Sequence, residues 1–141
     1  MLDTNAVLDL LHFDDATARP LRHALEGGRV RWAVTDATLD EWRRVLGYPE
    51  FSLDAAQQAA LLARYQTLSV RAEAVEGGAG LPRCSDPDDQ KFLELAAASR
   101  AQGLVSKDRA LLRLRRRCAP QFRIMTPDEA VRWLGGLLEK A

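Results

Sequence analysis

The chain has 141 residues, of which 47% are hydrophobic and 28% are charged, and its 20 basic residues balance its 20 acidic residues. This length fits one compact domain, and the composition excludes an intrinsically disordered chain. The balanced charge excludes a protein-wide positive field, so any contact with a polyanion has to come from a local basic patch.

Short apolar segments alternate along the chain with longer segments of helical period, which is the pattern of an α/β protein with a mostly parallel sheet. We expect strands, or in the first case the end of a strand, at 1–3, 31–34, 68–75, 103–106 and 122–125. We expect helices just after Asp3 and then at 16–25, 36–46, 54–65, 85–99, 109–117 and from 127 onward. We find no internal repeat, so residues 1–141 are expected to form one domain.

Two of these helices have clear start signals. Thr126 and Glu129 form a capping box, and Pro127 occupies the first helical position between them. Asp86 is the expected N-cap of the helix at 85–99. The Gly-Gly-Ala-Gly run at 77–80 predicts a loop within the domain.

The cysteines and tryptophans predict structural roles. Cys84 and Cys118 lack CxxC spacing, and we expect reduced thiols in a cytoplasmic protein. Trp32, Trp42 and Trp133 are expected in the core or at an interface, because none of them is interleaved with basic residues. No apolar run approaches the ~20 residues that a membrane span needs, so we expect no membrane insertion.

Four acidic residues stand where a strand or turn leads into a helix, namely Asp3, Glu41, Asp89 and Asp108. In open parallel sheets, ligands bind outside the carboxyl ends of the strands, and Asp3 and Asp108 should project over the same edge. Separated carboxylates that converge in this way predict a site for a divalent metal ion.

The helical positions of the other two acids are consistent with this site. Glu41 is rotated well away from the apolar stripe that includes Leu39 and Trp42, so it is free to face a cleft. Asp89 points to the same side as the apolar Phe92, where a lone charge would be costly and a metal ion would offset that cost. Each acid taken singly also fits an alternative, because acidic residues commonly cap helix N-termini or face solvent.

Four segments of the sequence resemble those of a known family, the PIN domains. The segments are Asp3-Thr4-Asn5, 35–46 with Glu41, 86–96 with Asp89, and 104–108 with Asp108, and they agree with the family in order and spacing over nearly all of the chain. The resemblance implies a three-layer α/β/α fold with a central, mostly parallel sheet of four to five strands. It also implies a metal-dependent ribonuclease, and the chain looks closest to the branch of the family with toxins of bacterial toxin-antitoxin pairs.

Carried to this sequence, the resemblance implies that the four acids bind Mg²⁺ or Mn²⁺, directly or through water. Asn5 would hold an oxygen of Asp3, and the hydroxyl of Ser106 would orient the site or a substrate phosphate. Asp88 is the rival of Asp89 as a ligand, because a shift of one residue in the helix start would exchange them.

The basic run after Asp108 predicts contacts to the RNA. The candidates are Lys107, Arg109, Arg113 and Arg116, the last three on one face of the helix expected at 109–117. The alternative is that these side chains form a solvated face beside a leucine stripe. The resemblance further implies a cognate antitoxin and a homodimer.

The chain departs from the family pattern at two places. Only Met1 and Leu2 precede Asp3, where family members have several apolar residues, so either the true start lies upstream or the first strand is truncated. Ser106-Lys107 stands where threonine and glycine are common, and Lys107 is expected to pair with a carboxylate.

Two other functions compete with the nuclease. One is a catalytically weak or silent PIN-fold module that binds or scaffolds a partner. The other is a receiver-like signalling domain, which would need paired acids at the end of the first strand and an aspartate at the end of a strong central strand. The sequence offers neither feature. Asp3 is followed by Thr4 and Asn5 instead of by a second acid, and no aspartate in the middle of the chain ends a strong apolar strand.

Overall fold

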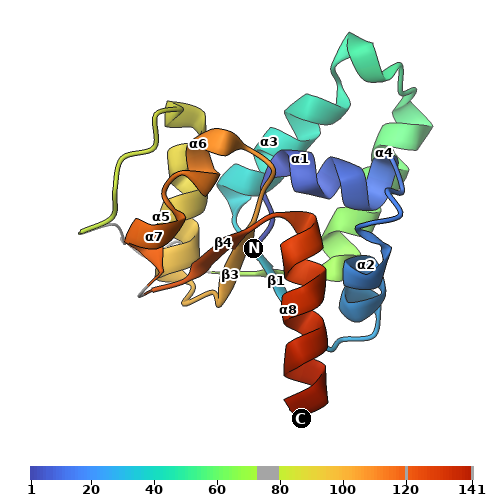
Figure 1. The fold of residues 1–141 in the computed structure, drawn as a ribbon. Helices are drawn as coiled ribbons and strands as arrows, with labels where there is room; N and C mark the ends of the chain where they lie inside the picture. The colour runs from blue at the N-terminus through green and yellow to red at the C-terminus, as the bar shows by residue number, and fades with distance from the viewer. Residues whose placement is uncertain (73–79, 120, 141) are drawn as a thin grey trace.

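The computed structural model describes residues 1–72, 80–119 and 121–140 (Figure 1). The α-helices in these ranges are α1 (Thr4–Val7), α2 (Arg19–Glu26), α3 (Asp36–Leu46), α4 (Ala55–Leu68), α5 (Gln90–Ala98), α6 (Arg109–Leu112), α7 (Arg115–Cys118) and α8 (Pro127–Lys140). The described ranges also contain one π-helix, η1 (Leu8–His12), and two 3-10 helices, η2 (Pro49–Phe51) and η3 (Pro87–Asp89). The loop expected at 77–80 lies outside the described residues, except for Gly80.

The strands form two separate parallel pairs. β1 (Trp32–Val34) pairs with β2 (Ser69–Arg71), and β3 (Gly103–Val105) pairs with β4 (Arg123–Met125). Within the described ranges, the expected single sheet of four to five strands does not form, because the N-terminal segment contributes one isolated bridge, from Leu2 to Val105. A strand between β1 and β3 would join the pairs, and a cavity of about 790 Å³ lies there, lined by residues that include Ala33 and Gly103.

The β3–β4 pair is covered on both faces. Leu104 and Ile124 pack with the residues of α5, whereas the neighbouring Val105 and Met125 pack with Leu134 and other residues of α8 and α2. This alternation is the period of two expected for a strand buried on both sides. Figure 1 shows α5 on one side of the pair and α8, which packs against α2, on the other. The α/β layering is therefore present around β3 and β4.

The start signals read from the sequence are confirmed where they were strongest. The amide of Thr126 donates to Glu129 Oε1 at 3.0 Å, and the amide of Glu129 donates to Thr126 Oγ1 at 3.2 Å, so the capping box closes at the start of α8. Thr35 caps α3 in the same reciprocal way through Thr38. Such caps stabilise a helix end by about 1 kcal/mol each.

The basic segment at 109–117 is not the single helix that its sequence predicts. The chain leaves helical geometry at Leu114, which has φ −94° and ψ 2°, and it separates α6 from α7. Leu114 is buried with Leu111, and its amide donates to the Leu111 carbonyl three residues back. After this turn Arg115 reaches Glu129 with two hydrogen bonds, of 3.0 and 3.1 Å. Tertiary packing has overridden the local helical preference.

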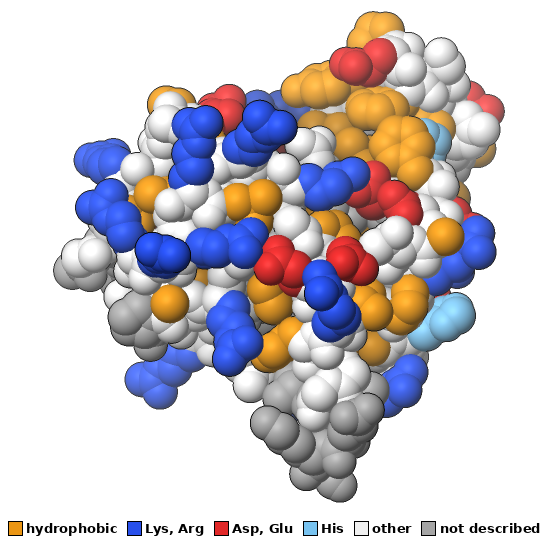
Figure 2. Space-filling view, viewed as in Figure 1, with side chains coloured by type: hydrophobic (Ala, Val, Ile, Leu, Met, Phe, Trp, Pro, Cys, Tyr) orange, Lys and Arg blue, Asp and Glu red, His pale blue; other side chains and the backbone are white. Residues whose placement is uncertain are grey.

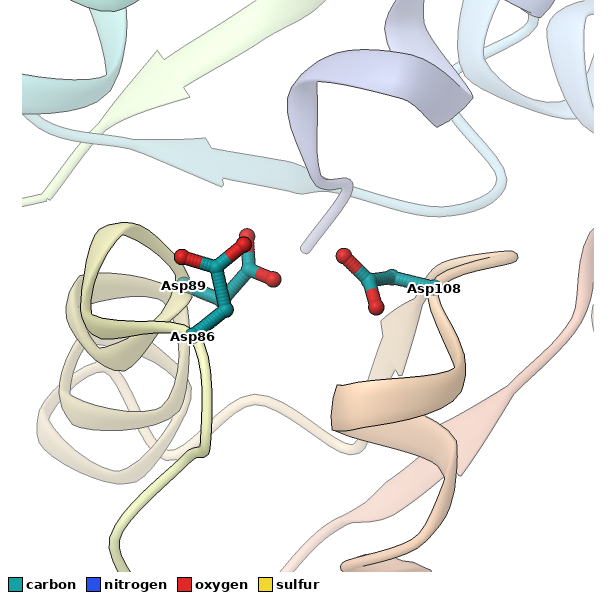
Figure 3. Close-up of side chains that lie close together, drawn as sticks. All are labelled: Asp86, Asp89 and Asp108. Carbon is teal, nitrogen blue, oxygen red and sulfur yellow. The ribbon is translucent and has the colours of Figure 1, made fainter.

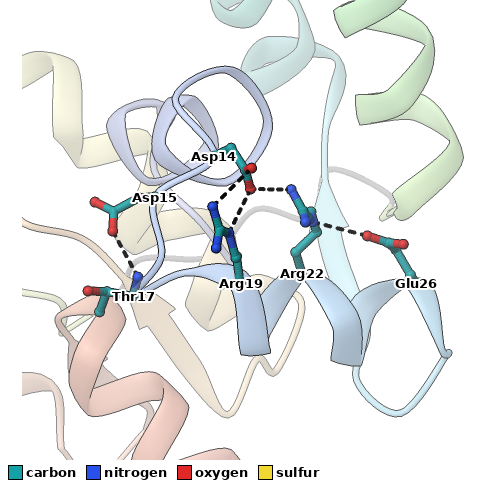
Figure 4. A network of polar contacts seen from close by, with 6 residues as sticks. All are labelled: Asp14, Asp15, Thr17, Arg19, Arg22 and Glu26. Carbon is teal, nitrogen blue, oxygen red and sulfur yellow. Dashed lines mark hydrogen bonds and ion pairs between the residues drawn. The ribbon is translucent and has the colours of Figure 1, made fainter.

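A network of charges fixes the turn between η1 and α2 (Figure 4). Asp14, with φ at 49°, accepts hydrogen bonds from both Arg19 and Arg22, and Arg22 also pairs with Glu26. The hydrogen bond from Arg19 lowers the pKa of Asp14. Helix α2 begins at Arg19 rather than at residue 16, because Pro20 has no amide hydrogen and is tolerated only in the first turn of a helix.

The core has two clusters of buried side chains, one around Trp32, Trp42 and Tyr65 and the other around α5, β3 and β4. Trp32 and Trp42 are each 1% exposed, which confirms the expected core role of these two residues. Cys84 and Cys118 are buried free thiols, as expected. In the ranges that the structure describes, no helix has both the length and the apolar character needed to cross a membrane.

Candidate metal centre

Three aspartates converge at the edge of the β3–β4 pair. One carboxylate oxygen from each of Asp86, Asp89 and Asp108 lies within 4.8 Å of the other two. Figure 3 shows Asp86 and Asp89 on the turn that leads into α5, and Asp108 facing them from the start of α6. Residues separated by about twenty positions along the chain therefore present their negative charge to one small volume.

Local backbone structure places two of these carboxylates. Asp86 is the N-cap of η3 and accepts a hydrogen bond of 3.0 Å from the amide of Asp88. Asp108 is the N-cap of α6 and accepts a hydrogen bond of 2.8 Å from the amide of Ala110. The capping role considered for these acids is confirmed, and the caps at the same time hold the carboxylates in position.

Asp89 has the most unfavourable environment of the three. Its Oδ2 atom is buried and has no hydrogen-bond partner among the described residues. Burial, together with the adjacent carboxylates of Asp108 and then Asp86, raises the pKa of Asp89 to about 8. Asp89 as a whole is half-buried, but a buried carboxylate oxygen without a partner is costly, and a divalent cation between these oxygens would remove both the repulsion and the missing contact. The set of oxygen ligands fits Mg²⁺ or Mn²⁺.

Asp3 is linked to this cluster through Ser106. The carboxylate of Asp3 is 3% exposed and accepts hydrogen bonds from the amide of Ala6, at 2.9 Å, and from the hydroxyl of Ser106. The same hydroxyl accepts a hydrogen bond of 2.9 Å from the amide of Asp108. Burial raises the pKa of Asp3 to about 6, against the effect of these hydrogen bonds.

Glu41 lies beside the cluster and already has a positive partner. Its Oε1 atom is 2.7 Å from the ammonium of Lys91, and its Oε2 atom accepts a hydrogen bond from the hydroxyl of Thr4. The charge of Glu41 contributes to raising the pKa of Asp3, so the two carboxylates are close enough to interact. Neither Asp3 nor Glu41 belongs to the group of three oxygens within 4.8 Å.

Two of the expected supporting or rival residues lie elsewhere. Asn5 is exposed, and the two oxygens of Asp3 are occupied by Ala6 and Ser106 instead of by its amide. Asp88 is exposed and does not join the three-oxygen group, whose third member is Asp86. The cause is the 3-10 turn η3, which directs the side chains of positions 86 and 89 to the same side.

The basic residues predicted to contact RNA differ in their surroundings. Lys107 pairs with the buried Asp9 at 2.5 Å, so its carboxylate partner is none of the four predicted ligands. Arg109, Arg113 and Arg116 are exposed. Arg109 lies in α6, Arg113 in the link before the break at Leu114, and Arg116 in α7, so the single helix expected to carry all three is wrong. Figure 2 shows Lys and Arg side chains gathered over the side of the molecule that carries α5, α6 and α7.

Three residues of the site were missed or undervalued from the sequence. Asp86 was assigned only as a cap, although its spacing of three from Asp89 is the spacing of residues on one helix face. Thr4 and Lys91 both contact Glu41, and no pattern in the sequence indicates either contact.

A family model described as the PIN domain matches residues 1–110, which is more than half of the chain. The chain belongs to the PIN domain family. PIN domains are typically nucleases that depend on divalent metal ions, and the acidic group of this PIN domain is consistent with that chemistry. No curated protein and no solved structure matches the chain. The matched region includes all four acids predicted from the sequence and also Asp86.

Proposed function

We propose that this PIN domain is an endoribonuclease that depends on Mg²⁺ or Mn²⁺. The observation that carries the proposal is the group of three carboxylate oxygens within 4.8 Å, one member of which, Asp89, has a buried oxygen without a partner. The three carboxylates repel one another, and a divalent cation bound between them would offset this repulsion.

The chain supplies the ligands and their positions. Asp86, Asp89 and Asp108 would hold the ion, and Asp3 would bind it directly or through water. The hydrogen bonds of Ser106 to Asp3 and to the amide of Asp108 would keep these two residues in position. The ion would offset the negative charge that builds on the scissile phosphate and would lower the pKa of a water molecule. Glu41 would bind the ion through a water molecule and would thereby position that water for attack.

Single-stranded or structured RNA is the substrate that we propose. Lys107 and the exposed Arg109, Arg113 and Arg116 would contact its phosphates. We further propose that residues 1–141 act as one domain in the cytoplasm, as the toxin of a toxin-antitoxin pair and as a homodimer. A small open reading frame directly upstream of the gene would support the toxin assignment, and its absence would favour a nuclease that acts alone.

The experiment is cleavage of a fluorescent single-stranded RNA in the presence of Mn²⁺. The Asp108→Asn and Asp89→Asn variants should lose cleavage, because each removes a charged ligand. Asp40→Asn is the matched control, since Asp40 is on α3 with an exposed side chain whose one ion-pair partner among the described residues is Arg43. Equal cleavage by the wild type and by Asp108→Asn would contradict the proposal.

The alternative is a catalytically weak or silent PIN module that binds a partner. It is favoured by the contacts of Glu41 and Asp3, because Lys91, Thr4, Ser106 and an amide already occupy their oxygens. Under this alternative, Mn²⁺ would still raise the melting temperature of the wild type, but no RNA would be cut. The two functions are thus separated by comparing a thermal shift with a cleavage assay on the same preparation.

A further inference from the structure

A second hollow opens directly beside the acidic cluster. It has a volume of about 310 Å³ and is lined by Asn5, Leu8, Asp9, Phe13, Lys107 and Asp108. Because Asp108 belongs to both, a chain of nucleotides with a phosphate at the cluster would place a neighbouring nucleotide at this hollow. The volume is at the lower end of the range of pockets that bind small ligands, and it leaves room for a single nucleobase.

Phe13 gives the rim of the hollow an unusual character. Phe13 is 56% exposed, although phenylalanine residues are normally buried. The ring lies beside two other aromatic rings, with centroids 4.8 Å from His12 and 6.3 Å from Phe51. An exposed aromatic ring offers a flat surface to a stacking partner.

The polar groups of the hollow suit a nucleotide as well. Asn5 is exposed and offers both donors and an acceptor. Lys107 is held at the hollow by its pair with Asp9 at 2.5 Å, yet its side chain remains 51% exposed, so it can approach a phosphate. An aromatic face, an amide and an ammonium group in one hollow are the three kinds of contact that bind the face, the edge and the phosphate of a nucleotide.

We propose that this hollow binds the nucleobase next to the scissile phosphate, with the ring of Phe13 stacked on the base, Asn5 at its edge and Lys107 at the adjoining phosphate. The inference rests on the ribonuclease function proposed above and specifies its substrate as RNA that is unpaired beside the cut. Duplex RNA could not present an unstacked base to Phe13. We therefore expect a base preference at one position of the RNA, the nucleotide whose base occupies the hollow.

The first test is binding of a short fluorescent single-stranded RNA without divalent metal, followed by anisotropy. Phe13→Ala should weaken binding about five- to a hundredfold, which is the effect of losing one base–aromatic stack. Phe13→Trp should restore it. Tyr48→Ala is the matched control, because Tyr48 is also an exposed aromatic residue, at 45%, but does not line the hollow. Equal binding by the wild type and by Phe13→Ala would overturn the proposal.

The second test is the cleavage pattern on a pool of random single-stranded RNAs. Phe13→Ala and Asn5→Ala should flatten base preference at the same single position beside the cut, while Tyr48→Ala leaves it unchanged. Binding is measured without metal, so loss of the Phe13 stack is detected even if no RNA is cut. The binding assay therefore tests the base-binding hollow separately from the proposed nuclease activity. If Phe13→Ala alters self-association and leaves RNA binding unchanged, the ring is a protein contact and the proposal is wrong.

Discussion

The hydroxyl of Ser106 donates a hydrogen bond to the carboxylate of Asp3 across a separation of 103 residues. Because the same oxygen also accepts from the amide of Asp108, one fully buried side chain connects the first and the last of the predicted acids. The hydroxyl is therefore as important to the geometry of the site as the carboxylates are.

Replacing this hydroxyl should destabilise the protein. Ser106→Ala leaves a buried carboxylate oxygen and the Asp108 amide without partners, at a cost of about 1–3 kcal/mol in the free energy of unfolding. Urea denaturation measures the change. Ser99→Ala is the control, because the Ser99 hydroxyl is buried but makes no hydrogen bond to any residue that the structure describes, and its removal should cost little. Equal losses in both variants would mean that the Ser106 contacts contribute no stability.

Stability without metal should fall as pH rises. The pKa of Asp3 is raised to about 6 and that of Asp89 to about 8, above the value near 4 of an unfolded chain. The folded state therefore binds protons more tightly, and this stabilisation is complete below pH of about 4 and is lost as pH rises to about 8. Melting temperatures in EDTA across this range measure the fall, which Asp89→Asn should reduce because its side chain stays neutral.

Addition of Mg²⁺ should reverse this loss. The ion competes with protons for the same oxygens, so its effect on the melting temperature should be larger near pH 8 than near pH 6. The Asp3→Asn, Asp108→Asn double variant should show no shift at either pH. A shift of the same size in wild type and double variant would show that the ion binds elsewhere.

Removal of Lys91 should strengthen metal binding. The ammonium of Lys91 neutralises Glu41 at 2.7 Å, so Lys91→Met increases the negative potential at the site and leaves Glu41 available to the ion. We expect a several-fold lower Mn²⁺ concentration at half-maximal thermal shift, together with a metal-free loss of about 1 kcal/mol in stability. Arg43→Met provides the comparison, because it removes a cation from the exposed face of α3. An unchanged Mn²⁺ midpoint in Lys91→Met would exclude Glu41 from the ion's surroundings.

Neutralising the exposed arginines should weaken RNA binding in a manner that depends on salt. For single strands, each lost phosphate contact lowers the slope of log K against log salt by about 0.7. The Arg109→Gln, Arg113→Gln, Arg116→Gln triple variant should therefore have a clearly shallower slope in anisotropy titrations. Arg115→Gln is expected to leave the slope unchanged, because Arg115 is paired with Glu129. If the triple variant keeps the wild-type slope, these arginines belong to a solvated surface.

Local signals in the sequence predicted local structure well. The capping box of Thr126 and Glu129 is present as expected, because both of its hydrogen bonds are made within four residues. The proximity of Asp3 and Asp108, which Ser106 connects, also followed from the sequence, since parallel strands direct the residues that follow them to one edge. These inferences depend on short stretches of chain and on a general rule of topology.

Features set by distant contacts could not be predicted. The break at Leu114 depends on burial of that side chain against the second core cluster, which no periodicity reveals. The pairing of Lys91 with Glu41 joins positions that are 50 residues apart. The separation into two sheets depends on how many residues of the N-terminal segment pair with β3, and the structure has one bridge there.

The separation of the strands into two pairs has a consequence for dynamics. Glu41 lies on α3, which packs in the first core cluster, whereas Asp86, Asp89 and Asp108 flank the second. An ion shared by these residues would cross-link the two halves of the core, whose strand pairs do not form one sheet within the described ranges. Amide hydrogen exchange should then slow in α3 and α5 together when the ion binds, because opening of either half would require its release.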